Sequence, residues 1–350
     1  METQLHIFFL PMMGQGQLKP TIDMAKLFVS RGLKATILTS PYHANLLSET
    51  LEDTHINLLS FKPIYVENGF PRGWESLPMD TRIDLLPKAG ITLAPQLDQL
   101  LQQHRPDCLV CGMFYPWATD VAAKHGIHSL MFHGWCYFSH CATLCVHRYE
   151  PQKNVSSDSD PFLIPNLPGE IKLTRNQLLD FLRKDEETEI AKLYKEIIQA
   201  EERCDGVLVN SFYELEPVYA DHWKYALGVN SWHIGPLFLH NKLDEVDKAN
   251  MDASESLKWL NSKKPSSVVY VCFGTNIRFS DAQLKEIALG LEASGQEFIW
   301  VVRREKQDDD EVNEEWLPER FEKRMEGKGL ILRGWAPKLR FLAMKLWEDL

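Results

Sequence analysis

The sequence lacks an excess of positive charge and any long apolar segment. Its 350 residues hold 38 Lys and Arg against 49 Asp and Glu, a net charge of -11, so it offers no basic face for a nucleic acid. The first apolar run, Leu5 to Met13, is broken by Pro11 and suits neither a signal peptide nor a membrane span. We therefore expect a cytoplasmic protein without a membrane span, and a buried strand at this run.

Paired cysteine motifs are also missing. The seven cysteines form an odd set without two C-x-x-C motifs, and Cys141 with Cys145 has no histidine in metal-ligand register. Free cysteine is among the most buried residue types. The sequence predicts reduced, mostly buried thiols and no metal site.

The N-terminal part alternates short apolar runs with segments of helical period, which is typical of a parallel sheet covered by helices. Strands are predicted at the runs listed at the end of this paragraph, and the first helix is expected to begin near Pro20 and to end before Gly32. These elements predict a doubly wound domain over residues 1–240, followed by a linker of mixed charge over residues 241–255. The predicted strands are His6 to Leu10, Lys34 to Thr39, Cys108 to Cys111, Ser129 to Phe132 and Gly206 to Asn210.

A second strand and helix pattern follows over residues 256–350. Ser280 and Gln283 resemble a capping box at a helix start. Three strands are expected, at Ser267 to Phe273, Glu297 to Val302 and Leu330 to Arg333, where a complete domain of this type has about six. The fold class is therefore α/β with two Rossmann-like domains, the second one incomplete. Its first strand would leave an apolar edge open for pairing with a partner.

The glycine-rich segment after the first strand lacks the third glycine of G-x-G-x-x-G, because Lys19 stands there. A tight strand-to-helix turn explains Gly14 and Gly16 without a bound phosphate. No G-x-S-x-G motif anchors a hydrolase triad. No nicotinamide or other cofactor is indicated.

Eight segments, in this order, together resemble the plant UDP-sugar-dependent glycosyltransferases, in particular the scopoletin glucosyltransferase-like group. The resemblance covers residues 5 to about 338. It implies two Rossmann-like domains of GT-B type, a small-molecule acceptor bound mainly by the first and a UDP-sugar co-substrate bound mainly by the second. The segments are His6-Ile-Phe-Phe-Leu-Pro-Met-Met-Gly-Gln-Gly, Pro20-Thr-Ile-Asp-Met-Ala-Lys, Arg105-Pro-Asp-Cys-Leu-Val, Met113-Phe-Tyr-Pro-Trp-Ala-Thr-Asp, Asn210-Ser-Phe-Tyr-Glu-Leu-Glu, Tyr270-Val-Cys-Phe-Gly-Thr, Gly290-Leu-Glu-Ala-Ser-Gly and Arg333-Gly-Trp-Ala-Pro.

The resemblance also implies a catalytic pair that this sequence lacks. In the family, a histidine after the first strand deprotonates the acceptor hydroxyl, an aspartate orients that histidine, and the oxygen attacks the anomeric carbon with inversion. The histidine position holds Gln17 and the aspartate position holds Gly112. A general base contributes about 10²- to 10⁴-fold to such a reaction. His133 and Asp120 are the candidate substitutes, although both also match ordinary structural positions of the family.

The remaining site residues follow from the same resemblance. Acceptor binding is expected at Gly16, Phe114, His133 and Trp135. Donor binding is expected at Gly274 and Thr275 for the diphosphate, at Trp335 for the uracil ring, and at Lys338, which stands where the family has a glutamine.

Three interpretations remain open. The chain is an active glucosyltransferase of small phenolic or similar hydroxylated metabolites, a non-catalytic protein that binds a small molecule or a partner, or a truncated gene product. The replaced base pair, and a C-terminal segment that departs from the family after Lys338, both argue for weak or absent activity.

Overall fold

The computed structural model describes residues 4–63, 69–71, 85–183, 188–240, 251–274, 279–302, 316–334, 336 and 341. The chain divides into two compact units, Met1–Asn241 and Lys242–Leu350. Each unit is described by itself. No helix within the described ranges is both long and apolar enough to cross a membrane.

Unit 1 is built on a seven-stranded, wholly parallel sheet with the strand order β3-β2-β1-β4-β5-β8-β9. This order places the first strand next to the fourth, as in doubly wound nucleotide-binding folds. The strands are β1 (His6–Leu10), β2 (Lys34–Thr39), β3 (Asn57–Ser60), β4 (Cys108–Gly112), β5 (His128–His133), β8 (Gly206–Val209) and β9 (Ser231–His233). The five strands predicted from the sequence are confirmed within one or two residues, whereas β3 and β9 were not predicted.

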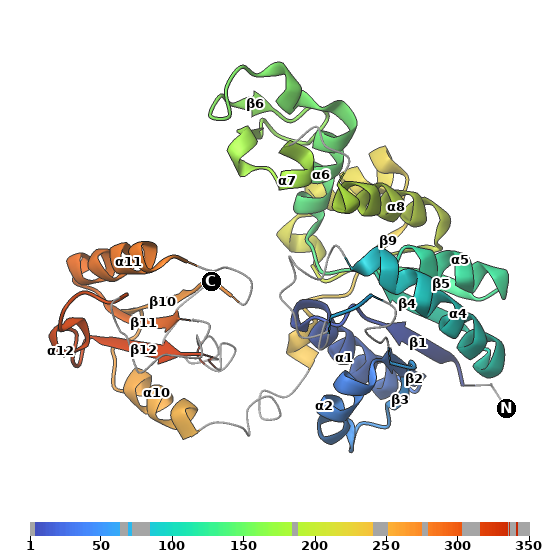
Figure 1. The fold of residues 1–350 in the computed structure, drawn as a ribbon, viewed down its shortest axis with the longest axis horizontal. Coiled ribbons are helices and arrows are strands. Elements are labelled where there is room, and N and C mark those ends of the chain that lie inside the picture. Colours follow the sequence, from blue (N-terminus) through green and yellow to red (C-terminus); the bar gives the residue numbers. More distant parts are fainter. Residues whose placement is uncertain are drawn as a thin grey trace. The chain divides into compact units, whose positions relative to one another are not determined.

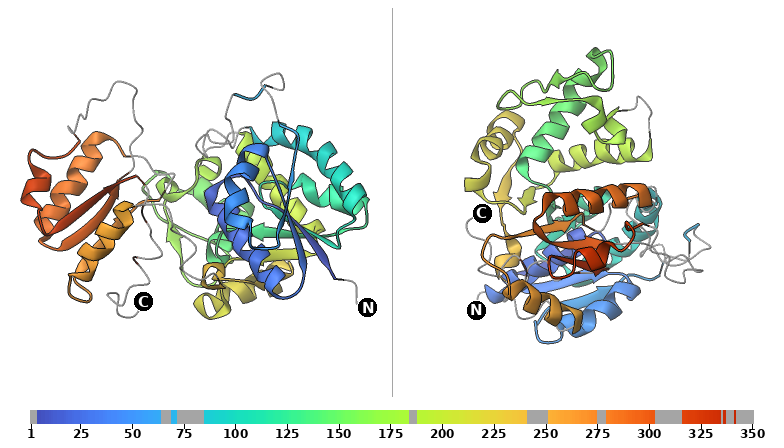
Figure 2. Two further views of the ribbon diagram at one scale, coloured as in Figure 1. Left: turned by 90° about the horizontal axis from the view of Figure 1, so that it is seen from below. Right: turned by 90° about the vertical axis from the view of Figure 1, so that its left-hand side faces the viewer.

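Helices cover both faces of this sheet (Figures 1 and 2). Helices α1 and α2 pack on one face, and α4, α5 and α8 on the other. The helices are α1 (Gln15–Ser30), α2 (Pro41–Leu51), α4 (Leu86–His104), α5 (Trp117–Lys124), α6 (Tyr137–Tyr149), α7 (Asp180–Arg183), α8 (Glu189–Arg203) and α9 (Pro217–His222). A short antiparallel hairpin joins β6 (Phe162–Leu163) to β7 (Lys172–Leu173). Single turns of tighter or wider helix lie at Pro151–Asn154, Arg175–Gln177, Tyr213–Leu215, Trp223–Leu227 and Leu237–His240.

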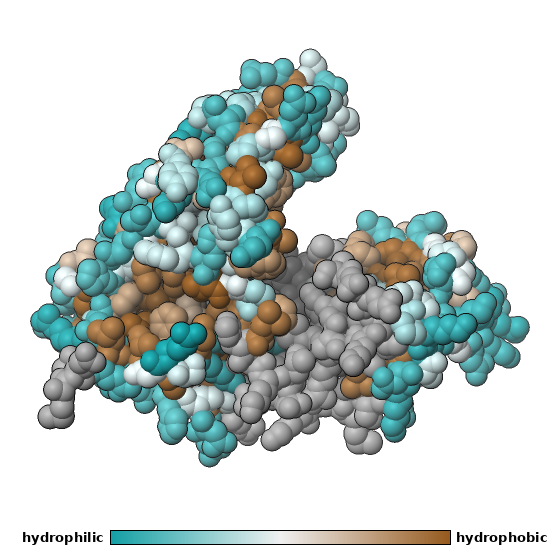
Figure 3. All heavy atoms as spheres, turned by 180° about the vertical axis from the view of Figure 1, so that it is seen from behind, coloured by the Kyte–Doolittle hydropathy of each residue, from teal (hydrophilic) through white to brown (hydrophobic). Residues whose placement is uncertain are grey.

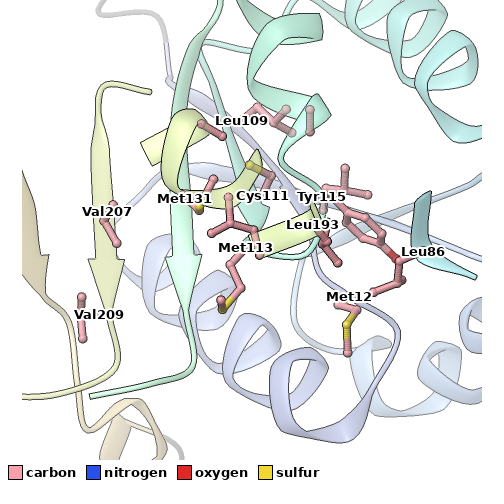
Figure 4. Packing of buried hydrophobic residues seen from close by; sticks show 14 of the residues in the cluster. Met12, Leu86, Leu109, Cys111, Met113, Tyr115, Met131, Leu193, Val207 and Val209 are labelled. Carbon is pink, nitrogen blue, oxygen red and sulfur yellow. The ribbon is translucent and has the colours of Figure 1, made fainter. Parts of the chain in front are cut away.

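Coverage on both faces explains why β1 is apolar at consecutive positions rather than at alternate ones. Phe8 and Leu10 point into the core on the α4 side, and Ile7 and Phe9 into the core on the α1 side. Strands of parallel sheets are buried in this way on both faces. Figure 4 shows part of the core on the α4 side, where side chains of β4, β5 and β8 pack with Leu86 and Leu193.

The first helix begins earlier than predicted, at Gln15. Pro20 therefore lies inside α1 and not in its first turn. Proline removes one backbone hydrogen bond and crowds the carbonyl four residues before it. That residue is Gly16. One residue further on, the hydroxyl of Thr21 donates to the carbonyl of Gln17 at 2.8 Å. Neither Gly14 nor Gly16 has a positive φ, so the tight turn predicted for the two glycines does not depend on that conformation.

Unit 2 contains a three-stranded parallel sheet with the order β10-β11-β12. Helices α11 and α12 pack on one face and α10 on the other. The elements are α10 (Met251–Asn261), β10 (Val268–Cys272), α11 (Asp281–Ser294), β11 (Glu297–Val302), α12 (Phe321–Arg324) and β12 (Gly329–Arg333). The three predicted strands and the capping box of Ser280 with Gln283 are confirmed.

The last part of the predicted linker is helical. Residues 251–255 belong to helix α10, whose buried Leu260 contributes to the core of unit 2. Residues 241–250 of that predicted linker lie outside the described residues.

Candidate functional site

The two positions of the predicted catalytic pair meet at the carboxyl edge of the unit 1 sheet. Gly112 is the last residue of β4, and Gln17 lies in the first turn of α1, directly after β1. Because β1 and β4 are neighbouring parallel strands, the segments that follow them emerge side by side. Ligands of such sheets bind at this edge.

The side chain of Gln17 fills the space beside Gly112. Gln17 is 6% exposed, and its Oε1 atom has no hydrogen-bond partner among the described residues. A Cβ atom added to Gly112 would lie 2.5 Å from that Oε1 and 3.1 Å from the backbone nitrogen of Met12. An aspartate at position 112 therefore requires Gln17 to move. As it stands, the pair offers a neutral amide and no group that accepts a proton.

The predicted acceptor residues divide into two groups. Gly16 is exposed at the start of α1, and its carbonyl oxygen lies 3.9 Å from the place where Gly134 would carry a Cβ. The same position is 3.9 Å from Cγ of Gln17, so Gly16, Gln17 and Gly134 converge on one small area. Phe114 and Trp135 are half-buried and pack against the core beside this area.

His133 does not belong to this area. Its side chain is 1% exposed and lies inside unit 1, with Nε2 3.1 Å from Oε1 of Glu201. Its predicted contact with an acceptor stays a prediction. Asp120, the other candidate for a substitute base, forms an ion pair with Arg203 at 3.0 Å on the surface between α5 and α8.

His140 of α6 completes a buried cluster with His133 and Glu201. Its Nε2 lies 3.2 Å from Oε2 of Glu201, and the two imidazole rings meet edge to face at 4.8 Å. Burial lowers the pKa of His140 and favours its neutral form. Burial by itself would raise the pKa of the Glu201 carboxyl, but the two imidazoles lower it to about 2.

Glu201 was not among the predicted site residues, although the sequence carries one signal for it. Leu193, Tyr194, Ile197 and Ala200 form the buried stripe of α8, and Glu201 lies on the same side of that helix. A charged residue on an apolar stripe is rarely buried without a partner. Nothing in the sequence identified that partner, since His133 and His140 lie more than sixty residues away along the chain.

A second buried carboxylate holds the segment that carries Trp135. Glu216 accepts hydrogen bonds from the backbone N–H groups of Tyr137 and Phe138, at 2.9 and 2.8 Å, and from the hydroxyl of Ser211. These N–H groups open helix α6, where a negative charge is favoured. Glu216 thus links the end of the Asn210-to-Glu216 motif to the start of α6.

The donor positions are described only in part. Gly274 follows β10 with a φ of +81°, in the left-handed region that favours glycine, and open space surrounds the place of its missing Cβ. It lies at the carboxyl edge of the unit 2 sheet. Thr275, Trp335 and Lys338 lie outside the described residues. Their predicted contacts with a UDP-sugar stay predictions.

Comparison with curated proteins gives long alignments to plant enzymes. UDP-glucose flavonoid 3-O-glucosyltransferase 7 of Fragaria ananassa is 52% identical over 349 residues, which cover 97% of this chain and 70% of that protein. Scopoletin glucosyltransferase of Nicotiana tabacum is 47% identical over 97% of this chain and 73% of its own length. No protein-family model matches the chain.

Solved structures agree with these relatives. UGT73P12 of Glycyrrhiza uralensis, complexed with glycyrrhetinic acid 3-O-monoglucuronide, superposes with a TM-score of 0.83 at 36% identity, over 97% of this chain and 71% of that one. UGT71G1 of Medicago truncatula, complexed with UDP-glucose, has a TM-score of 0.73 at 24% identity, over 98% of this chain and 74% of that one, and supports the GT-B fold alone. From identities of about half over nearly its whole length, the chain belongs to the plant UDP-glycosyltransferases.

Proposed function

We propose that this chain binds a small phenolic or similar plant metabolite at the carboxyl edge of the unit 1 sheet, and transfers glucose to it from UDP-glucose weakly or not at all. The flavonoid and scopoletin enzymes named above support the substrate class. UDP-sugars are the co-substrates of this family, which needs no further cofactor. The observation that carries the reduced activity is the buried Gln17 amide that fills the space beside Gly112.

The expected reaction is an attack of the acceptor hydroxyl oxygen on the anomeric carbon, with UDP as the leaving group and inversion at that carbon. The hydroxyl must lose its proton as the new bond forms. An imidazole has an ordinary pKa near 6.5 and accepts that proton near neutral pH, whereas a neutral amide does not. Without the base, we expect a rate about 10²- to 10⁴-fold lower than that of an enzyme that has it.

A non-catalytic binding protein is the second candidate, and it rests on the same observation. The exposed Gly16 and Gly134, with the half-buried Phe114 and Trp135, leave a small-molecule surface beside Gln17 that needs no base in order to bind. An aromatic acceptor would stack on such side chains.

Pairing with a partner through the unit 2 sheet is a further part of the proposal. In the described part of unit 2, strand β10 pairs only with β11, so its other edge carries unpaired backbone groups. Val269 and Phe273 on and beside this strand are 45% and 39% exposed, and Figure 3 shows apolar side chains reaching the surface of both units. Exposed strand edges of this kind pair readily with another chain.

The test measures both transfer and binding. The chain is incubated with UDP-glucose and a panel of coumarins and flavonols, beside the variants Gln17→His, Gly112→Asp and the double variant. Acceptor affinity is followed in parallel by quenching of tryptophan fluorescence. Because Gln17 occupies the space needed at position 112, we expect Gly112→Asp alone to give no gain and the double variant to transfer fastest.

Each outcome bears on one part of the proposal. Transfer by the unmodified chain at the rate of the double variant would contradict the loss of the base. Acceptor binding without transfer by any variant would favour the binding protein. The absence of both binding and transfer would contradict both candidates.

A further inference from the structure

His133, His140 and Glu201 form a buried polar cluster that the proposed transfer reaction does not use. The three residues come from β5, α6 and α8, and their side chains are 1 to 3% exposed. One ligand atom from each residue can be chosen so that all three lie within 4.8 Å of one another. The cysteine spacing that predicted no metal site is unrelated to this cluster.

The contact between His133 and Glu201 is close but is not an aligned hydrogen bond. Nε2 of His133 lies 3.1 Å from Oε1 of Glu201, yet neither of these atoms has a hydrogen-bond partner in the described structure. Nδ1 of His133 has none either. A buried polar atom without a partner lowers the stability of the folded chain. A hydrogen-bonded trio therefore explains the contact of His140 with Glu201 at 3.2 Å, but not the orientation of His133.

Ligands of a metal ion have this arrangement. The lone pairs of such ligands point at a common centre instead of at one another. With metal–ligand bonds of about 2.0–2.1 Å and tetrahedral angles, neighbouring ligand atoms lie about 3.3 Å apart without forming a hydrogen bond. Nε2 of His133 lies 3.1 Å from Oε1 of Glu201 and Nε2 of His140 lies 3.2 Å from Oε2, so a centre between the two nitrogens and this carboxylate would be bound through both of its oxygens.

The charge of the cluster also suits a cation. One carboxylate and two imidazoles supply one negative charge and two nitrogen donors, which a divalent cation accepts. Among the described residues, Glu201 forms ion pairs with these two histidines and with no Lys or Arg. The ring of Trp223 stacks on His140 with centroids 4.0 Å apart and shields the cluster from solvent.

We propose that His133, His140 and Glu201 bind one zinc ion inside unit 1. Two imidazole nitrogens and a carboxylate are a set of ligands that zinc takes in proteins. The ion would connect β5 and α6, which precede and follow the segment that carries Trp135, to helix α8. The three side chains leave the fourth tetrahedral position to a water molecule. We assign the ion a structural role because these side chains are 1 to 3% exposed.

The test uses the whole chain, expressed and purified without a histidine tag. Zinc content is measured by mass spectrometry after dialysis against zinc and then against buffer, and Co²⁺ is titrated as a spectroscopic probe. We expect about one zinc per chain, a visible Co²⁺ absorption band typical of tetrahedral coordination, and a rise in Tm with zinc that a chelator reverses.

Two variants test the proposed ligands, and two further variants serve as controls. Glu201→Gln and His140→Asn keep much of the side-chain shape, and each should weaken zinc binding by more than the roughly 10- to 100-fold that loss of an outer-shell partner costs. His128→Ala is the matched control, since His128 is exposed and paired with Asp205. Cys272→Ser excludes binding at the exposed thiol.

The wild-type titration decides the matter even if a variant fails to fold. Absence of zinc, of a Co²⁺ band and of a shift in Tm in the wild-type chain would overturn the proposal and leave a hydrogen-bonded cluster. Binding that survives in Glu201→Gln and His140→Asn but disappears in Cys272→Ser would place the metal elsewhere and overturn it equally.

Discussion

At the residue scale, Gln17 and Gly112 share one space, so substitutions at the two positions should not act independently. The amide is the flexible end of a side chain and can move, whereas the backbone nitrogen of Met12, 3.1 Å from the same place, cannot move as easily. Coupled effects are expected between residues in direct contact. A change at position 112 is therefore interpretable only together with position 17.

We expect Gly112→Ala to lower the free energy of unfolding by about 1–3 kcal/mol, because its Cβ would displace the buried amide of Gln17 and would lie 3.1 Å from the backbone nitrogen of Met12. In a Gln17→Ala background the same change should cost less. Denaturant unfolding of the four proteins measures this coupling as a double-mutant cycle.

Gly16→Ala is the matched control for that cycle. No atom lies within 4 Å of its added Cβ, and the residue is helical, so we expect it to change stability by no more than about 1 kcal/mol, with a gain favoured. An equal cost of Gly112→Ala in both backgrounds would show that the amide is not the obstacle.

At the scale of elements, the start of helix α6 depends on a side chain far away in the sequence. The N-cap residue of α6, Cys136, makes no side-chain capping bond, and the carboxylate of Glu216 accepts from the first backbone N–H groups instead. The helix dipole strengthens these contacts. The orientation of α6, which also carries His140, thus depends on the segment after β8.

Glu216→Gln should lower stability by about 1–3 kcal/mol, since an amide keeps the shape but loses the charge and turns a donor toward the helix N–H groups. We also expect weaker acceptor binding, because Trp135 directly precedes the residues that Glu216 holds. Thermal unfolding and fluorescence quenching measure the two effects.

Glu214→Gln serves as the control for that prediction. Glu214 is exposed and belongs to the same short segment, so we expect a change within about 0.5 kcal/mol. If both variants lost the same stability, net charge rather than the contact at α6 would account for the effect.

At the scale of the whole molecule, each unit has its own core. The two hydrophobic clusters of unit 1 fall between Ile7 and Leu237, and the two of unit 2 between Leu260 and Phe341. A unit with a complete core of its own is able to fold as an independent domain.

Residues 1–240 expressed alone should therefore unfold in one cooperative transition, at a midpoint close to that of one of two transitions in the full chain. The fragment should also retain acceptor binding, since all predicted acceptor residues lie within it. Calorimetry and fluorescence titration test this. A fragment without a cooperative transition would contradict the independence of unit 1.

The sequence by itself determined the parallel sheets, and its resemblance to the family supplied the prediction about positions 17 and 112. The apolar runs at His6–Leu10 and Glu297–Val302 predict buried parallel strands, because local periodicity and side-chain volume decide burial on both faces. The capping box at Ser280 is a local signal of the same kind. The order of the motifs was enough to predict that Gln17 and Gly112 stand at the positions of the family's catalytic pair.

Only the tertiary structure decided which distant residues meet. Pairing of β1 with β4 brings Gln17 to Gly112, and the packing of α8 on the sheet brings Glu201 to His133 and His140. These contacts depend on strand order and helix rotation, which no local pattern contains. For the same reason, the buried orientation of His133 and the support that Glu216 gives to α6 became visible only in the folded chain.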